Sequence, residues 1–545
     1  MGESFFGLNV AVRGLFTAQR SLDTVNHNLN NVNTPGYSRQ RTVQAASRPM
    51  ALYDGTGMMG TGAEITGVKR VRDEYLDFKY WSENISLGEW KAKREVLSDI
   101  EVTFNEPSDS GFTTIMNEFF SSLQDLGKDP SSSAVRALVK QKGVTLAKYF
   151  NSTAAHFEGL QQDVNYRIQT KVEEVNSYAT QIQQLNRQIY ISELDGKIAN
   201  DMRDNRTLLV DRLSKIINIE ANEIVYGKLP DGRADMHFAI TISGKALVDH
   251  FDISKLMIEQ RSAAKKVNTE DVDNLYEVKW ADGNSLNIKG GELRGYLDVR
   301  DGNEADPNPA TSLNGILSPN YKGIPYYQKK INEFVRTFAR AFNEGYIDMD
   351  GDKQYSAGDF DGTGHADGYG YNTAANGYRF FTMKGIGGLP VSNTTFLNGA
   401  AAPADIYALY KNVTAKSFTV SSDIINNTNL IAASGTAFEA GNIEALGSIL
   451  QMRHNRDMFS EGAPEDFMKS LVAALGIDSQ KAKNYQSNQQ VIVTQITNRR
   501  LSDSGVSIDE EMTNLVKFQQ AYNASAKMIQ TMGEIYDTLI NRLFA

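Results

Sequence analysis

The stretch Asn30–Gln40, NNVNTPGYSRQ, decides where the first helix of this chain ends. Five asparagines crowd the approach to it: Asn26, Asn28, Asn30, Asn31 and Asn33. Thr34-Pro35-Gly36 follows, and proline fixes φ and disfavours a helical residue before it, whereas glycine reaches conformations closed to other residues. The stretch therefore predicts a helix stop and a turn close to the N-terminus.

The segment before this stop carries a heptad pattern. Its repeat positions are spaced alternately by three and four residues: Phe5, Leu8, Val12, Leu15, Gln19, Leu22, Asn26 and Leu29. Such spacing predicts a coiled-coil helix, and a polar residue in the seam costs stability but can fix register and partner. The alternative is an ordinary amphipathic helix on a core.

The last segment repeats the pattern. Its seam positions are Ile508, Met512, Leu515, Gln519, Tyr522, Ala526, Ile529, Gly533, Tyr536 and Ile540. A second stripe lies beside them: Ser525, Met528, Met532, Ile535 and Leu539. Ser507 and Glu510 fit a capping box at the start of a helix roughly 55 Å long. So wide an apolar face predicts more than one neighbour.

Between the ends, periodicity predicts helices over 84–104, 111–126, 129–195, 204–217 and 324–345, and again from about 440 onward. Alternating strands begin near residue 218, and a Gly-, Asp- and Asn-rich stretch up to about 435 predicts short strands and loops. The predicted fold class is mainly α with inserted β-rich domains. Paired terminal coiled-coil helices adjoin a long-helix bundle that carries the β-rich parts on its outside.

The predicted domain boundaries follow these changes of pattern. Residues 1–45 and 505–545 form the terminal coiled-coil domain. Residues 46–217, 290–345 and 436–504 form the helical bundle domain. Residues 218–289 and 346–435 form β-rich inserts, as either two domains or one.

Composition excludes several classes of function. The 545 residues carry a net charge of -10, which argues against the clustered basic surface of a nucleic-acid-binding protein. There is no cysteine, so disulfides and thiolate sites are excluded. The sequence also predicts no transmembrane span and no cleaved signal peptide.

Catalytic and cofactor motifs are absent from the sequence. The six histidines are scattered without ligand spacing: His27, His156, His237, His250, His365 and His454. We find no HExxH, no GxxxxGK[ST] and no GxSxG. We therefore expect no enzyme activity, no cofactor and no metal site.

One acidic loop resembles a calcium-binding loop in its first positions. It places carboxylates at Asp348, Asp350, Asp352 and Asp359. Lys353 stands where the sharp turn needs glycine, and Asp359 stands where a bidentate glutamate belongs. We expect a solvated turn with weak cation binding or none.

Both ends of the chain carry a family resemblance. LNNVNTPGYSRQ, ending at Gln40, and the segment from Gly505 to Leu543 resemble the terminal signatures of flagellar axial proteins, which include rod, hook and hook-associated proteins. The continuation YSRQ and internal stretches such as GGELRGYLDVRDG, GYRFFT and FTVSSDIINNTNLIAAS are similar to the branch that forms the first hook–filament junction. Residues 220–289 and 346–415 match weakly.

The resemblance implies a structural adaptor at that junction. It implies that the terminal helices pair into a coiled coil lining the channel of the axial tube, with the seam residues above as the subunit interface. The turn Asn33, Thr34, Pro35, Gly36 and Tyr37 would send the chain outward to the next domain.

The implied partners are copies of the chain itself, the hook protein, the second junction protein and an export chaperone on the C-terminal helix, with no nucleic acid and no membrane. The implied location is the flagellum outside the cell, reached by type III export. The alternatives are a hook protein, the second junction protein or, more weakly, an enzyme carried by the β-rich insert.

Overall fold

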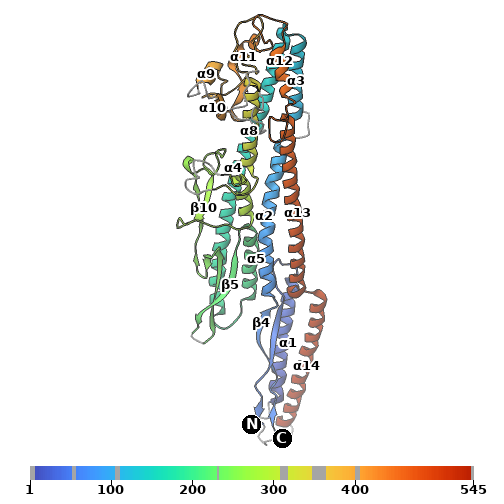
Figure 1. The fold of residues 1–545 in the computed structure, drawn as a ribbon. Coiled ribbons are helices and arrows are strands. Elements are labelled where there is room, and N and C mark those ends of the chain that lie inside the picture. Colours follow the sequence, from blue (N-terminus) through green and yellow to red (C-terminus); the bar gives the residue numbers. More distant parts are fainter. Residues whose placement is uncertain are drawn as a thin grey trace.

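The chain forms an elongated molecule whose two ends lie side by side at one tip (Figure 1). This computed structural model describes residues 6–51, 57–104, 111–229, 232–306, 317–345, 364–398 and 406–541, and only the backbone of 406–408 and 539–541. Helix α1 (Phe6–Asn30) pairs with helix α14 (Ile508–Asn541) along this end of the molecule. The predicted pairing of the two terminal helices is confirmed.

The resemblance implied that the chain turns outward after α1. In the structure it instead doubles back along α1. Strands β1 (Gln40–Ala46) and β4 (Ala63–Arg70) form an antiparallel pair packed on α1, with the short pair β2 (Met50–Ala51) and β3 (Met58–Met59) beyond it. These strands were not predicted from the sequence, because the pair is half-exposed and has few apolar residues. Polar bonds hold it instead, such as the one that the Thr17 hydroxyl donates to the Ala63 carbonyl at 3.1 Å.

A bundle of long helices forms the body of the molecule. It contains α2 (Glu74–Phe104), α3 (Phe112–Lys128), α4 (Ser133–Glu193), α5 (Asn200–Ile216), α6 (Glu292–Asp301), α8 (Ile324–Glu344), α12 (Glu444–Met452) and α13 (Pro464–Ser504). α13 runs along α2, where the rings of Trp90 and Tyr485 stack 4.5 Å apart. The predicted helices are confirmed with shifted ends. α2 begins ten residues before the predicted start, and α4 begins after a Ser132 cap rather than at Asp129-Pro130.

Small sheets pack on one side of α4 (Figure 1). One has the order β5-β6-β7-β8, with β5 (Glu220–Lys228), β6 (Ala234–Ile242), β7 (Lys245–Asp249) and β8 (Asp252–Ile253). Another pairs β9 (Leu256–Gln260) with β10 (Tyr276–Trp280). Side-chain amides of α4 reach their backbone, as where Asn186 donates to the His250 carbonyl at 2.9 Å and Asn176 to the Leu256 carbonyl at 2.9 Å. The strands predicted from residue 218 are confirmed.

The end of the molecule opposite the termini is built from short elements around α3 and α8. They are β11 (Phe381–Met383), β12 (Phe418–Val420), α9 (Asn393–Asn398), α10 (Ile406–Lys411) and α11 (Ser422–Asn426). The acidic loop with Asp348, Asp350, Asp352 and Asp359 lies outside the described residues. Buried apolar side chains form one core from α2 through both β-rich parts, so the domain boundaries stay predictions.

His365 fastens this distal end as a neutral ring. Its Nδ1 lies 2.7 Å from the Tyr378 carbonyl oxygen, and its Nε2 accepts from the Ala432 amide at 2.9 Å. Burial lowers the pKa of His365 to about 4, because a second ring proton would be desolvated and would break the Ala432 bond.

Acid should therefore weaken this end of the molecule. The unfolded chain protonates His365 near its ordinary pKa of 6.5 and the folded chain only near 4, so stability falls as pH drops through that window. Between pH 6.5 and pH 4, the unfolding free energy of His365→Gln should fall by less than that of the parent, with a difference on the order of 2 kcal/mol. Denaturant titrations across the window measure this, with the exposed His156→Gln as control. Parallel pH curves for all three proteins would contradict it.

Candidate functional site at the terminal rod

The terminal rod, defined as α1, α14, β1 and β4, closes through small residues in a strict antiparallel register. A Cβ atom on Gly7 would lie 2.8 Å from Met532 Cε, and one on Gly14 would lie 3.0 Å from Ser525 Oγ. At the far end, the Asn28 side chain donates to Glu511. These partners recur every seven or fourteen residues on both helices. The contacts on α14 therefore include the second stripe of the sequence analysis.

The predicted coiled-coil seam lies beside this pairing face, roughly a third of a turn around α1. Its described apolar members on the two helices are partly exposed: Leu8, Val12, Leu15, Leu22, Leu29, Leu515, Tyr522, Ile529 and Tyr536. Asn26, Ile508 and Met512 are exposed. Phe5 and the side chain of Ile540 lie outside the described residues. The chain's own fold thus leaves most of the seam without full cover, and its role as a subunit interface stays a prediction.

The outer surface of the rod displays large apolar side chains. Phe16 on α1 is 62% exposed, and Ile508, Met512 and Val516 on α14 are each about half exposed. Among the described side chains of α14, only Glu511 is buried. α14 thus leaves much of its apolar surface accessible within the chain.

The Asn28 cluster, defined as Asn28, Tyr37, Arg39, Gln40 and Glu511, joins three segments of the rod. The buried Asn28 amide donates to the Gln40 carbonyl at 2.9 Å and to Glu511 Oε2 at 3.1 Å. Its oxygen accepts from the Gln40 amide at 2.9 Å and from the Tyr37 hydroxyl at 2.8 Å. Arg39 Nε donates to Glu511 Oε1 at 2.7 Å. The amide of Asn28 is therefore fully bonded.

The cluster holds one phenol with a shifted pKa, that of Tyr37, and pairs with one further carboxylate, that of Glu510. Burial, followed by nearby carboxylates, raises the pKa of Tyr37, so its hydroxyl keeps the proton that it donates to Asn28. Glu510 was predicted to complete a capping box with Ser507. Its amide lies 3.5 Å from the Ser507 hydroxyl, but its carboxylate pairs with Arg39 at 2.6 Å, so only half of the box forms.

The joint, defined as Ser38, Arg70, Arg72, Asp77 and Asp204, fastens the rod to the body. Asp204 of α5 accepts from the Ser38 amide and hydroxyl, each at 2.8 Å, and from Arg70 Nη1 at 2.9 Å. Arg72 forks onto Asp77 of α2 at 2.6 and 2.9 Å. These bonds link the turn and β4 with the first turns of α2 and α5.

A third arginine extends the joint to α13. Arg500 pairs with Asp77 at 2.9 Å and with Asp211 at 3.0 Å, and Trp81 donates to Asp211 at 2.6 Å. Burial raises the pKa of Asp211, and the charge of Arg500 opposes that rise. Arg500 therefore favours the ionised form of the Asp211 carboxyl, which burial disfavours.

Four of the five predicted turn residues are exposed to solvent, and the fifth is partly buried. Asn33, Thr34, Pro35 and Gly36 are exposed, and Tyr37 is partly buried in the Asn28 cluster. Gly36 has φ +81°, and a Cβ there would lie 3.2 Å from Leu208 Cβ. The turn therefore lies close against α5.

Sequence reasoning singled out the turn but missed its partners. Asp204, Glu511 and Arg500 sit on helices that are far apart in the chain, and Arg72 lies in the connection before α2. Nothing local distinguishes the four from surface charges. The signal for Asn28 was present, since it stands one heptad after Ser21 and two heptads after the tight position Gly14.

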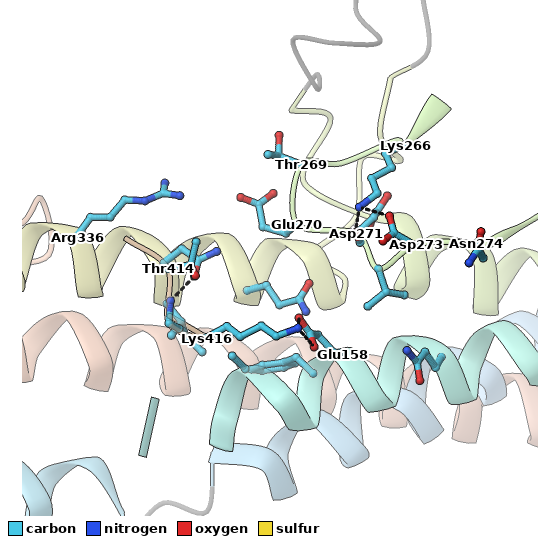
Figure 2. Close-up of a pocket in the computed structure, with 18 residues that line it drawn as sticks. Glu158, Lys266, Thr269, Glu270, Asp271, Asp273, Asn274, Arg336, Thr414 and Lys416 are labelled. Atoms are coloured by element: carbon cyan, nitrogen blue, oxygen red, sulfur yellow. Dashed lines mark hydrogen bonds and ion pairs between the residues drawn. The ribbon is translucent and has the colours of Figure 1, made fainter. Parts of the chain in front are cut away.

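Away from the rod, a cleft lies on the body between α4, α8 and the segments 266–274 and 414–416 (Figure 2). This cleft measures about 550 Å³ and is lined by two ion pairs, Lys416 with Glu158 at 2.8 Å and Lys266 with Asp273 at 2.9 Å. The described residues lining it include no histidine, serine or cysteine. Within the described ranges, no three acidic or histidine side chains could together hold a metal ion.

Replacing Gly36 should strain the turn. We expect Gly36→Ala to lower the unfolding free energy by ~1–2 kcal/mol, because alanine disfavours positive φ and its methyl group would press on Leu208. Chemical denaturation measures this. Gly60→Ala is the matched control, since nothing lies within 4 Å of a Cβ there. Equal effects of the two substitutions would contradict the role of Gly36.

Removing the carboxylate of the joint should cost more. We expect Asp204→Ala to destabilise the fold by about 3 kcal/mol, because it leaves Arg70 and the Ser38 amide and hydroxyl without their buried acceptor. Asp195→Ala removes an exposed carboxylate and should change stability by less than ~0.5 kcal/mol. A joint variant as stable as this control would refute the assignment.

Family models match three parts of the chain. The FlgK helical domain of the flagellar hook-associated protein matches residues 97–354. The flagellar basal body rod FlgEFG C-terminal model matches 497–543, and the flagella basal body rod protein model matches 8–37. No helix in the described part of the chain is both long and apolar enough to cross a membrane.

Similar proteins extend over nearly the whole chain. Flagellar hook-associated protein 1 of Bacillus subtilis is 28% identical, covering 99% of both chains. That of Escherichia coli is 27% identical, covering 98% of this chain and 99% of the relative. In fold, the flagellar hook junction protein FlgK from Burkholderia pseudomallei matches with a TM-score of 0.54 and 13% identity, over 79% of this chain and all of the other. Over nearly its whole length the chain is thus similar to flagellar hook-associated protein 1, a part of the flagellum.

Proposed function

We propose that this chain is a structural adaptor at the hook–filament junction. Copies of it assemble through their terminal helices into a short tubular collar on the hook, and this collar permits the filament to grow. The printed names of its relatives support the location. The surface of the terminal rod supports the mode of assembly.

The single observation that carries the proposal is the incomplete burial of the rod. Phe16, Ile508, Met512 and Val516 are about half exposed or more, although each is large and apolar. Fully burying one such side chain is worth about 1.5–3 kcal/mol. Contact among neighbouring rods would gain this energy several times per subunit, and the seam residues would form the interface.

The same surface suggests who the partners are. Copies of the chain would cover the rod laterally, with the hook protein on one side of the collar and the second junction protein on the other. Before assembly, an export chaperone would cover α14, whose described side chains are almost all accessible. Type III export would carry the chain out of the cell.

Charges placed on the outer face of α14 should block assembly without unfolding the subunit. We expect Met512→Glu/Val516→Glu to leave the melting temperature within ~3 °C of the parent and to abolish growth of flagellin on isolated hooks incubated with purified protein. Adding protein from outside separates assembly from export. Electron microscopy of the hooks gives the readout.

Gln520→Glu/Asn523→Glu is the matched control, because it adds the same charges at exposed polar positions of α14. The control should support filament growth. If the Met512→Glu/Val516→Glu protein also supports growth, the outer face of α14 is not the assembly surface and the proposal is wrong.

A further inference from the structure

We infer that the Asn28 cluster sets the register of α14 on α1 and thereby determines which faces of the rod are displayed. Its position points to this role. Asn28 is 1% exposed and Glu511 is 2% exposed, so both polar groups are buried within a pairing face made mostly of small residues. A buried polar pair is worth much more in register than out of it.

The rest of the pairing face repeats and so discriminates poorly between registers. Gly7, Gly14, Ser21 and Asn28 are one heptad apart on α1, and Glu511, Phe518, Ser525 and Met532 are one heptad apart on α14. Sliding α14 by one heptad, about 10 Å, would again set glycines of α1 against the same row of α14. Only at Asn28 does the row offer hydrogen bonds that a slide would break.

A slide would also strand charges in the interior. Glu511 would leave Arg39 Nε, which it contacts at 2.7 Å, and Asn28 would keep only its bonds to Gln40 and Tyr37. The joining residues 505–507 limit such movement but do not by themselves fix the register. Beyond Arg500, which is held in the joint, residues 501–503 at the end of α13 are exposed, and unwinding there would lengthen the connection.

The consequence for assembly rests on the proposed function. A slide of one heptad would move Ile508, Met512 and Val516 about 10 Å along α1 and so would change where they lie relative to the seam residues of α1. Subunits in the wrong register would display a surface that their neighbours do not match.

Cysteine cross-linking tests the register directly, because the chain contains no cysteine of its own. A Cβ on Gly14 would lie 3.9 Å from Ser525 Cβ, within the range of a disulfide. The pair Gly14→Cys/Ser525→Cys reports the native register. The pairs Gly14→Cys/Phe518→Cys and Gly14→Cys/Met532→Cys report a slide of one heptad in either direction.

Each pair is oxidised in the purified full-length chain, in the parent and in the Asn28→Leu background. We expect Asn28→Leu to lower the ratio of native to slipped disulfide by about tenfold. Asn26→Leu is the matched control, since Asn26 is exposed on the same helix, and it should leave the ratio unchanged. Glu511→Leu should act like Asn28→Leu.

Three results would overturn the inference. In the first, the Asn28→Leu chain forms only the native disulfide. In the second, it forms none of the three disulfides, so the cluster is needed for the helices to pair at all and not for their register. In the third, two glycines inserted after Gly505 slip the register and Asn28→Leu does not, so the connection sets it. Because this assay needs no hook, its failure is distinguishable from failure of the proposed function.

Discussion

The amide group of Asn28 is the contact on which the terminal rod depends. It bonds the end of α1 to the returning backbone at Gln40 and to the first turn of α14, which lies 483 residues further along the chain. Apolar packing is not directional, and helices that meet through glycine and serine can slide. A saturated amide in a buried position has only one arrangement in which all its bonds form, and so it fixes the geometry of its neighbours.

The joint extends this constraint into the body. Ser38 and Arg39 are adjacent, and one bonds Asp204 of α5 whereas the other bonds Glu511 of α14. Two short connections, residues 71–73 and 505–507, also cross between rod and body. Rotation of the rod would therefore break several buried charge-assisted bonds at once. We interpret the joint as the element that holds the rod at a fixed angle to the long helices.

The two parts of the molecule are stabilised in different ways. The body has a contiguous apolar core in which aromatic side chains such as Phe119, Phe334 and Phe338 are fully buried. In the rod, α14 buries only Glu511 among its described side chains. Apolar packing is therefore the main stabilising interaction of the body. The rod is held by directed polar bonds and keeps apolar surface available for contacts with other molecules, as expected of a subunit in a flagellar structure.

The sequence alone determined the long helices, the helix stop at Pro35-Gly36 and the strands from residue 218, because periodicity and turn chemistry are local properties. It also indicated that the terminal helices pair, since the apolar stripe on each helix needs a partner surface to cover it. It could not assign the pairing face, because the stripe of Leu8 and Leu15 is more apolar than the row of Gly7 and Gly14 that α14 contacts. Close approach of backbones, and not hydrophobicity, selects that row. The strands β1 and β4 and the partners Asp204 and Glu511 were decided only by the tertiary structure, because a buried hydrogen bond depends on residues that the fold alone brings together.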